Sequence, residues 1–453
     1  MNHSYLNHGG SYSKGMRYLV FIDFPKVDIK IEGMEGVSIP KTFRIRQLFD
    51  KTCIEDIPAV IRRQMSDNLK DHNRFRGKKL CITAGSRGIP DIDRIIRTVI
   101  DVLKEWGADP FIVPAMGSHG GATAEGQREM LATYDITEET MGVPIKSSMD
   151  VVQIGELPDG TPLYCDKFAA ESDGIVLLNK VNPHTDFRGE HESGLAKMLA
   201  IGLANHIGAS QFHMKGFATF AERIPQVCDV FIKKLPIAFG LGLVQNAYDK
   251  ISRIEIMEKE LILEKDAELL RFAKAGHGGF KIDNIDVLII DEIGKNICGN
   301  GFDPNIVGRG PSPGFEGILN LQKLFIRGLN EETHHSGCGI SLADATTRRC
   351  LRSIDVETTW INVVTSTVLG GGRLPMYMET DRDVLRLLIR TCNGIDYSNP
   401  RVVRIKNTLS MDQIEVSEAF LEECKSHPEI EILSSPHEIE FDPDGFMTDD
   451  VWS

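Results

Sequence analysis

Residues 174–216 read GIVLLNKVNPHTDFRGEHESGLAKMLAIGLANHIGASQFHMKG and predict how the chain is organised. The apolar run at 174–179 predicts a buried strand, because both faces of a parallel strand are covered by other elements. A loop rich in ionisable groups follows, and it leads into small and apolar residues that predict a helix. Strand, loop and helix in this order are typical of an α/β fold.

Two earlier segments repeat this order. Residues 79–84, KLCITA, predict a strand that ends at the glycine loop GSRGIP. Residues 110–114, PFIVP, predict another strand, which ends before the loop GSHGGAT at 117–123. The carboxyl ends of parallel strands meet at one edge of a sheet, and ligands bind at that edge in open α/β folds. We therefore expect the three loops to converge on one site.

The length of 453 residues is typical of two or three domains. The run IDVLIID at 285–291 opens a second α/β region after the break GHGG at 276–279. We expect two α/β domains with Rossmann-like parallel sheets flanked by helices. The predicted divisions are a flexible N-terminus (1–15), an N-terminal domain with the catalytic loops (16–279), a C-terminal domain (280–409) and a tail (410–453). Packing of the tail back on the first domain is one alternative that the sequence does not decide.

The composition excludes several classes of protein. A formal net charge of −14 argues against non-specific binding to nucleic acid or to an anionic membrane. No apolar run approaches the roughly 18 residues of a membrane span, and the polar N-terminus lacks the apolar region of a signal peptide. The nine cysteines are scattered without a CxxC pair, which makes a disulfide framework or structural zinc site unexpected. A cytoplasmic location is predicted.

Two histidines on the predicted loops suit acid/base chemistry. His119 lies between small residues in GSHGG, where a substrate can approach closely. His184 precedes Asp186, and a carboxylate can fix the tautomer of a catalytic imidazole. The alternatives are a histidine that stabilises its turn and a His–Asp pair with a structural role.

Lys197 and His213 are unusual for the segments in which they stand. Lys197 lies among small and apolar residues, and desolvation would leave its amine neutral and nucleophilic. The alternative is a side chain that extends to the surface. His213, between Phe212 and Met214, is a candidate ligand for nickel or a soft metal, or else a core histidine.

Three further residues are candidate anion ligands. Arg87 in its glycine loop can bind a carboxylate or phosphate through two parallel hydrogen bonds. Lys295 and Asn296, in the first loop of the second domain, could close on the same anion. The alternative for all three is a solvated surface position. Motifs of dinucleotide-binding folds, P-loops, zinc proteases and serine hydrolases are not found in the expected context.

Four motifs together resemble the nickel-dependent lactate racemase family, in an uncharacterised branch. They are GSRGIPD, GSHGGAT, NPHTDFRGEHESGLAK and QFH, and the resemblance spans roughly residues 17 to 410. The family has two α/β domains hinged around an interdomain active site, and it uses a nickel-pincer nucleotide made by dedicated cofactor-synthesis proteins. The sequence does not indicate an oligomeric state.

The resemblance implies a role for each candidate residue. Lys197 would hold the nickel-pincer nucleotide covalently through a thioamide, and His213 would ligate the nickel. His119 and His184 would be the acid/base pair that exchanges the proton of an α-hydroxyl group while hydride moves from C2 to the cofactor and back. The implied activity is that of a racemase or epimerase. The remaining implied contacts are Ser86 and Gly120 to the cofactor, and Arg87, Asp186, Arg188, Lys295 and Asn296 to the substrate.

The sequence also departs from the family pattern. Gly85 and Ser86 stand where the family has aspartate and threonine, and Gly120 stands where it has arginine. The interval from His184 to Lys197 is about three residues longer and adds polar residues. These differences predict a substrate larger and more hydroxylated than lactate, such as a sugar acid.

Three other functions remain open from the sequence. One is a homologue without cofactor that binds an anionic ligand. Another is a zinc metallohydrolase that uses His184, His191 and His213. The third is a redox enzyme with free nicotinamide, which the missing fingerprint disfavours.

Overall fold

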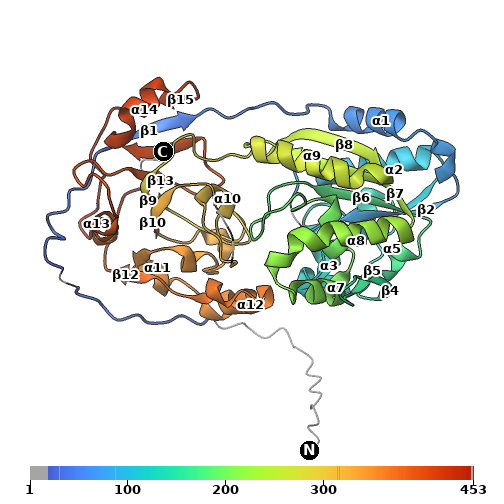
Figure 1. The fold of residues 1–453 in the computed structure, drawn as a ribbon, viewed down its shortest axis with the longest axis horizontal. Coiled ribbons are helices and arrows are strands. Elements are labelled where there is room, and N and C mark those ends of the chain that lie inside the picture. Colours follow the sequence, from blue (N-terminus) through green and yellow to red (C-terminus); the bar gives the residue numbers. More distant parts are fainter. Residues whose placement is uncertain are drawn as a thin grey trace, which may run out of the picture.

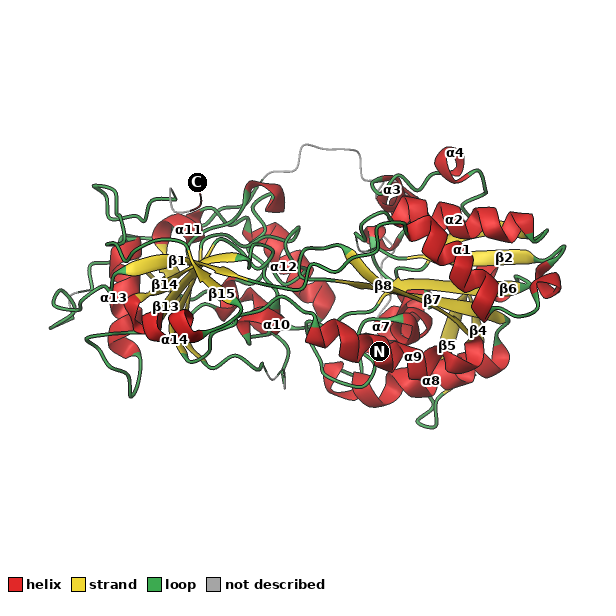
Figure 2. Cartoon of the chain, turned by 90° about the horizontal axis from the view of Figure 1, so that it is seen from above, coloured by secondary structure: helices red, strands yellow, loops and turns green. Residues whose placement is uncertain are grey.

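The computed structural model describes residues 19–29, 31–86, 88–313, 315, 317–449 and 452. The chain forms two lobes side by side, each built on a β-sheet with helices on both faces (Figures 1 and 2). The α/β fold class is confirmed. Among the residues described, no helix is both long and apolar enough to span a bilayer.

The first lobe contains a five-stranded sheet in the order β3-β2-β6-β7-β8. Four strands are parallel, and β8 runs antiparallel to β7. The three predicted strands are confirmed as β2, β3 and β6. The strands are β2 (Lys79–Ala84), β3 (Asp109–Pro114), β6 (Gly174–Lys180), β7 (Ile237–Gln245) and β8 (Ile251–Glu258), with a separate hairpin of β4 (Val151–Glu156) and β5 (Pro162–Asp166).

Alternating side chains of β6 supply two cores. Ile175 and Leu177 pack under the helices α6 to α9, whereas Val176 and Leu178 face α1 and α2. Both faces of β6 are therefore buried, as the continuous apolar run predicts. The helices are α1 (Ile57–Asn68), α2 (Ile92–Glu105), α3 (Ala124–Ala132), α4 (Glu138–Met141), α5 (Lys167–Ala170), α6 (Leu195–Lys197), α7 (Asn205–His213), α8 (Phe220–Lys234) and α9 (Ile262–Ala275).

The second lobe is built on an eight-stranded sheet in the order β12-β11-β10-β9-β13-β14-β1-β15. The first five of these strands are parallel, and the last three add antiparallel pairings. Its elements are β1 (Thr42–Gln47), β9 (Ile285–Ile290), β10 (Leu321–Ile326), β11 (Ala345–Thr347), β12 (Met376–Met378), β13 (Val402–Ile405), β14 (Gln413–Ser417), β15 (Ile430–Ile432), α10 (Pro304–Val307), α11 (Arg348–Arg352), α12 (Val356–Ser366), α13 (Asp381–Thr391) and α14 (Leu421–Ser426).

One segment lies in a different lobe from the one that the sequence indicated. Strand β1, expected in the N-terminal domain, pairs with β14 and β15 in the second sheet, and Figure 1 shows it beside α14. The tail from residue 410 supplies β14 and β15 to this same sheet. Strand β1 lies between them in the sheet, although β14 is about 370 residues away in the chain. The predicted flexible residues 1–15 lie outside the described part.

The chain passes between the lobes twice, at 48–56 and at 276–284 (Figure 1). The second connection is held by polar contacts. His277 Nε2 lies 3.2 Å from a carboxylate oxygen of Asp303, at the start of α10. The Lys281 amide donates to the side chain of buried Gln47 at 2.6 Å. These contacts tie the connecting segment to the second lobe.

Candidate active site

The loops after β2, β3 and β6 converge on one segment, as the sequence predicts. The Gly117 amide, after β3, donates to the carbonyl of Gly202 at 3.0 Å. A Cβ atom at Gly85, after β2, would lie 3.5 Å from the Met198 side chain. Met198 to Gly202 form a π-helix directly after α6. The convergence therefore centres on the helical segment that follows the β6 loop.

The loop of His119 is held in shape by close backbone contacts. Gly120 has a φ of +66°, and a Cβ atom there would lie 2.5 Å from the Gln127 nitrogen. Only glycine fits this position. Nδ1 of His119 lies 2.8 Å from the Met116 carbonyl, which can only accept, so Nδ1 carries a proton. Nε2 of His119 is then the basic nitrogen in the neutral ring.

His184 is almost fully buried at 9% exposure, at the start of the long loop after β6. The Asp186 amide donates to its Nδ1 at 3.0 Å. Its Nε2 lies 2.5 Å from Nζ of Lys197. Because Nδ1 accepts an N–H, we assign the remaining ring proton to Nε2, which directs it at the lysine. The ring also packs against Phe187, with centroids 4.5 Å apart.

Lys197 ends the short helix α6 and is half-buried. Its chain neighbours Ala196 and Met198 are buried. The amine is not exposed to solvent alone, because Nζ lies within hydrogen-bond distance of Nε2 of His184. The structure thus brings together the two residues that the sequence singled out as an amine nucleophile and an acid/base group.

His213 ends α7, within electrostatic range of the Lys197 and Asp186 side chains. Burial lowers its pKa below the ordinary value. Nδ1 lies 2.7 Å from the Ala209 carbonyl, which fixes the proton on that nitrogen. A neutral ring whose other nitrogen donates to a carbonyl is the usual form of a metal-binding histidine.

Asp186 and Arg188 connect the His184 loop to the second lobe. Asp186 accepts a hydrogen bond of 2.7 Å from the Ser312 hydroxyl, and Asn300 lies at 3.5 Å. The Arg188 guanidinium stacks on Phe315 at 4.3 Å and donates to the His184 carbonyl at 2.7 Å. In this structure both side chains hold the loop, and their predicted contact with substrate stays a prediction.

The other predicted ligands of substrate and cofactor contact residues other than His184 and Lys197. Lys295 is exposed, and its Nζ lies 2.5 Å from the Asn362 side chain on α12. Asn296 donates to Glu332 at 2.8 Å. The Ser86 carbonyl accepts from the Tyr134 hydroxyl at 2.8 Å. Arg87 lies outside the described residues.

Several residues of this site were not indicated by the sequence. Asp266 and Lys274 come from α9, about 70 to 80 positions after the loop that they contact, and no local pattern marks them. Ser312 comes from the second lobe. Its only signal is the glycine-rich stretch 308–317, which is typical of a loop that approaches another backbone closely.

The zinc alternative lacks a donor set in the described part of the chain. No group of three or more His, Cys, Asp and Glu side chains there could hold a metal ion. His191, one of the three proposed ligands, is buried against Asp266. His213 instead presents one imidazole nitrogen, Nε2, that the Ala209 carbonyl does not contact.

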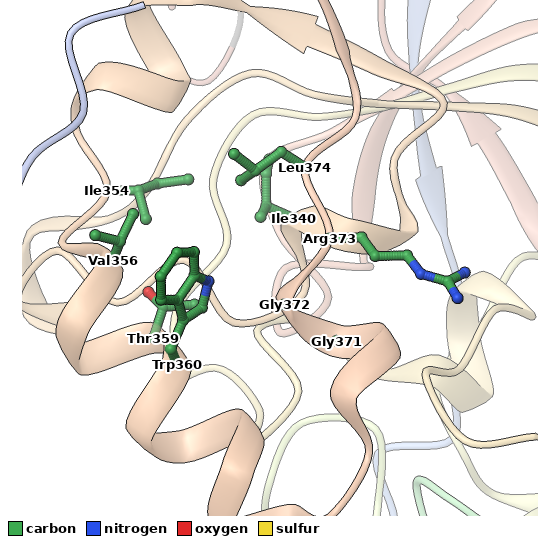
Figure 3. Close-up of a pocket in the computed structure, with 9 residues that line it drawn as sticks. All are labelled: Ile340, Ile354, Val356, Thr359, Trp360, Gly371, Gly372, Arg373 and Leu374. Carbon is green, nitrogen blue, oxygen red and sulfur yellow. The ribbon is translucent and has the colours of Figure 1, made fainter.

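A small pocket lies beside Trp360 in the second lobe (Figure 3). Ile340, Ile354, Val356 and Leu374 line it, and the guanidinium of Arg373 extends away from these side chains. It contains none of the predicted site residues. An apolar pocket of this kind has no acid/base pair for proton transfer.

The geometry is matched by a sequence relationship to a known family. Residues 51–223 match the lactate racemase N-terminal domain, a range that includes His119, His184, Lys197 and His213. This part of the chain is similar to that domain. A solved structure of the lactate racemase apoprotein from Thermoanaerobacterium thermosaccharolyticum aligns over 81% of this chain and 99% of its own, at 15% identity and a TM-score of 0.47. Comparison with curated proteins gives no match.

Proposed function

We propose that this protein is an isomerase, a racemase or epimerase that inverts C2 of an α-hydroxy acid. The observation that carries the proposal is the hydrogen bond between Lys197 and His184, in a lactate racemase domain that also places His213 near them. The three residues supply an attachment point, an acid/base group and a metal ligand.

The residues present fit a lysine-tethered nickel-pincer nucleotide, which would accept and return a hydride when bound. Lys197 offers a half-buried amine within hydrogen-bond distance of His184. His213 offers Nε2, because Nδ1 is engaged with the Ala209 carbonyl. One protein ligand is sufficient for a metal whose other ligands come from its cofactor.

His119 and His184 then handle the substrate proton. Nε2 of His119 is basic because Nδ1 donates to Met116, so His119 takes the hydroxyl proton at Nε2. His184 presents the N–H tautomer at Nε2, so in this form it donates a hydrogen bond to the substrate oxygen. The hydroxyl oxygen loses a proton as hydride leaves C2 and regains one as hydride returns to the other face, and His119 and His184 form the acid/base pair for this exchange.

Attachment at Lys197 also changes what His184 contacts. In the structure the lysine amine occupies the hydrogen bond of His184 Nε2. An acylated amine is neutral and has no basic lone pair, so it no longer competes for that proton. Nε2 of His184 is then available to a substrate hydroxyl group.

For the substrate we propose a sugar acid such as an aldonate. The support is the open space beside Gly121, where a Cβ atom would have no neighbour within 4 Å. The polar residues added near His184 do not support a sugar-acid substrate. Glu192 is fully buried and Arg188 donates to backbone carbonyls, so both are structural contacts of the loop.

The test is to co-express the chain with nickel-pincer nucleotide synthesis proteins and to measure intact mass and nickel content. We expect one adduct and close to one nickel per chain, both lost in Lys197→Ala. Lys215→Ala is the matched control, because Lys215 is an exposed lysine that pairs with Asp159. Loaded protein is then assayed by chiral chromatography on lactate and on C2-epimeric aldonates.

Each outcome decides between functions. Racemisation that depends on Lys197 establishes the isomerase, and the preferred acid establishes the substrate class. Unmodified, nickel-free wild type beside a correctly loaded lactate racemase would overturn the proposal. It would favour the homologue without cofactor that binds an anion.

A further inference from the structure

The loop between His184 and Lys197 rests on α9, a helix outside the segment that matches the racemase domain. Asp266 and Lys274 lie eight residues apart on α9, just over two helical turns. Both therefore project from one face of the helix. That face meets the buried polar groups of the loop.

Asp266 contacts the chain two residues before Lys197. It is 1% exposed, and its Oδ1 accepts from the Leu195 amide at 2.6 Å. Its Oδ2 lies 3.1 Å from Nδ1 of His191. A buried carboxylate that is satisfied by both a backbone N–H and an imidazole fixes its neighbours strongly.

Gly194 shows how closely Asp266 approaches the backbone. A Cβ atom at Gly194 would lie 2.2 Å from Oδ1 of Asp266, closer than any contact between real atoms of these types. The carboxylate of Asp266 thus occupies the space that a side chain at residue 194 would fill, at the start of α6. The backbone before Lys197 is set by this contact.

Glu192 fixes the backbone at the other end of the loop, next to His184. Its side chain is fully buried, and it accepts from the amides of His184 at 2.7 Å and Gly189 at 3.1 Å. Lys274 Nζ donates to Glu192 at 2.6 Å and compensates its charge. The position of the His184 backbone therefore depends on a carboxylate whose partner is on α9.

We propose that α9 sets the distance between His184 and Lys197, with Asp266 positioning the lysine and the Glu192–Lys274 pair positioning the histidine. The three are positioning residues for the reaction, and this inference rests on the proposed roles of His184 and Lys197. A displacement of about 1 Å in such a pair can cost on the order of 100-fold in rate.

The first test compares Lys274→Met with Lys265→Met in loaded enzyme. Both lysines lie on α9, but Lys265 pairs with Glu268 away from the loop. We expect Lys274→Met to lower kcat about 10-fold with KM within about twofold, while Lys265→Met leaves both unchanged. Equal kcat in the two variants would overturn the inference.

The second test separates positioning from stability. Glu192→Gln/Lys274→Met removes the buried charge together with its partner, so we expect Tm to recover toward that of the wild type. The new amide has one acceptor oxygen where the His184 and Gly189 amides both donate, so kcat should stay low. Recovery of kcat together with Tm would show a purely structural role and overturn the inference.

The third test does not depend on activity or cofactor. Crystal structures of the cofactor-free wild type and Lys274→Met should show the Lys197–His184 separation rising from hydrogen-bond distance to beyond 3.5 Å. An unchanged separation would overturn the inference. A separation that rises, in a protein whose loaded wild type fails to racemise any acid, would keep the positioning and reject the proposed function.

Discussion

The Nζ atom of Lys197 lies 2.5 Å from Nε2 of His184, so the proposed attachment residue and the proposed acid/base residue share one hydrogen bond. The Asp186 amide on the other ring nitrogen fixes the tautomer of His184. Acylation of the amine, as proposed, would change the partner of Nε2.

Replacing His184 by glutamine removes the titratable ring but keeps a polar side chain. We expect His184→Gln to lower kcat by about 100- to 10,000-fold, the usual contribution of a general acid/base, with the adduct at Lys197 retained. Chiral chromatography and intact mass measure the two effects. His206→Gln is the control, because His206 is exposed and contacts Ser210 on α7. More than a third of wild-type activity in His184→Gln would contradict the assignment.

Two adjacent glycines in the His119 loop offer a matched pair of substitutions. Gly120 and Gly121 have φ of +66° and +64°, but a Cβ atom at Gly120 meets the backbone of Gln127, whereas Gly121 has no atom within 4 Å. We expect Gly121→Ala to cost about 1 kcal/mol of stability from backbone strain alone. Gly120→Ala should cost about 1–3 kcal/mol more, from overlap that shifts the loop.

Thermal unfolding and kcat together check this difference. Gly120→Ala is expected to displace His119 and lower kcat at least 10-fold, while Gly121→Ala changes kcat less than twofold. Equal melting temperatures for the two variants would show that the loop is not packed as the structure has it.

Ser312 links the second lobe to the His184 loop through Asp186. Ser312→Ala removes a hydrogen bond to a carboxylate, an interaction of about 1.5–3 kcal/mol, from a residue that is 4% exposed. We expect KM to rise about 3- to 10-fold, because the two lobes are less firmly joined at the site. Steady-state kinetics on the loaded enzyme measure this. Ser336→Ala, at a buried serine whose hydroxyl faces Cys338, should leave KM unchanged.

Asp303 should make the stability of the protein depend on pH, through its contact with the segment between the lobes. Burial alone would raise the pKa of this carboxyl, but His277 and the Asn305 amide bring it below its ordinary value of 3.8. A lowered folded-state pKa stabilises the protein above pH 3.8, and this stabilisation is lost as pH falls through the folded-state value.

The melting temperatures of wild type and Asp303→Asn should therefore differ most near neutral pH and converge at acid pH. Asparagine keeps an acceptor for the Asn305 amide, so the comparison isolates the carboxylate charge. A difference that remains constant from neutral pH to about pH 3 would contradict the role assigned to the Asp303 carboxylate.

The sequence by itself determined the central strands of the first lobe and the candidate residues of the site. Strands β2, β3 and β6 are confirmed because an apolar run and the glycine loop after it are local features. The parallel order of these strands follows from the intervening helices, so the convergence of their loops could also be predicted. The motifs likewise named His119, His184, Lys197 and His213, all of which fall in the matched racemase domain.

Only the tertiary structure decided which distant groups meet. The alternation of Thr42 to Gln47 indicates a strand but not its sheet, since its partner β14 lies some 370 residues away. Asp266 became a contact of the Lys197 helix, and Ser312 a contact of Asp186, by packing across lobes and helices. Local periodicity reflects the backbone of each element, whereas these contacts depend on which buried polar groups must satisfy one another after the chain has folded.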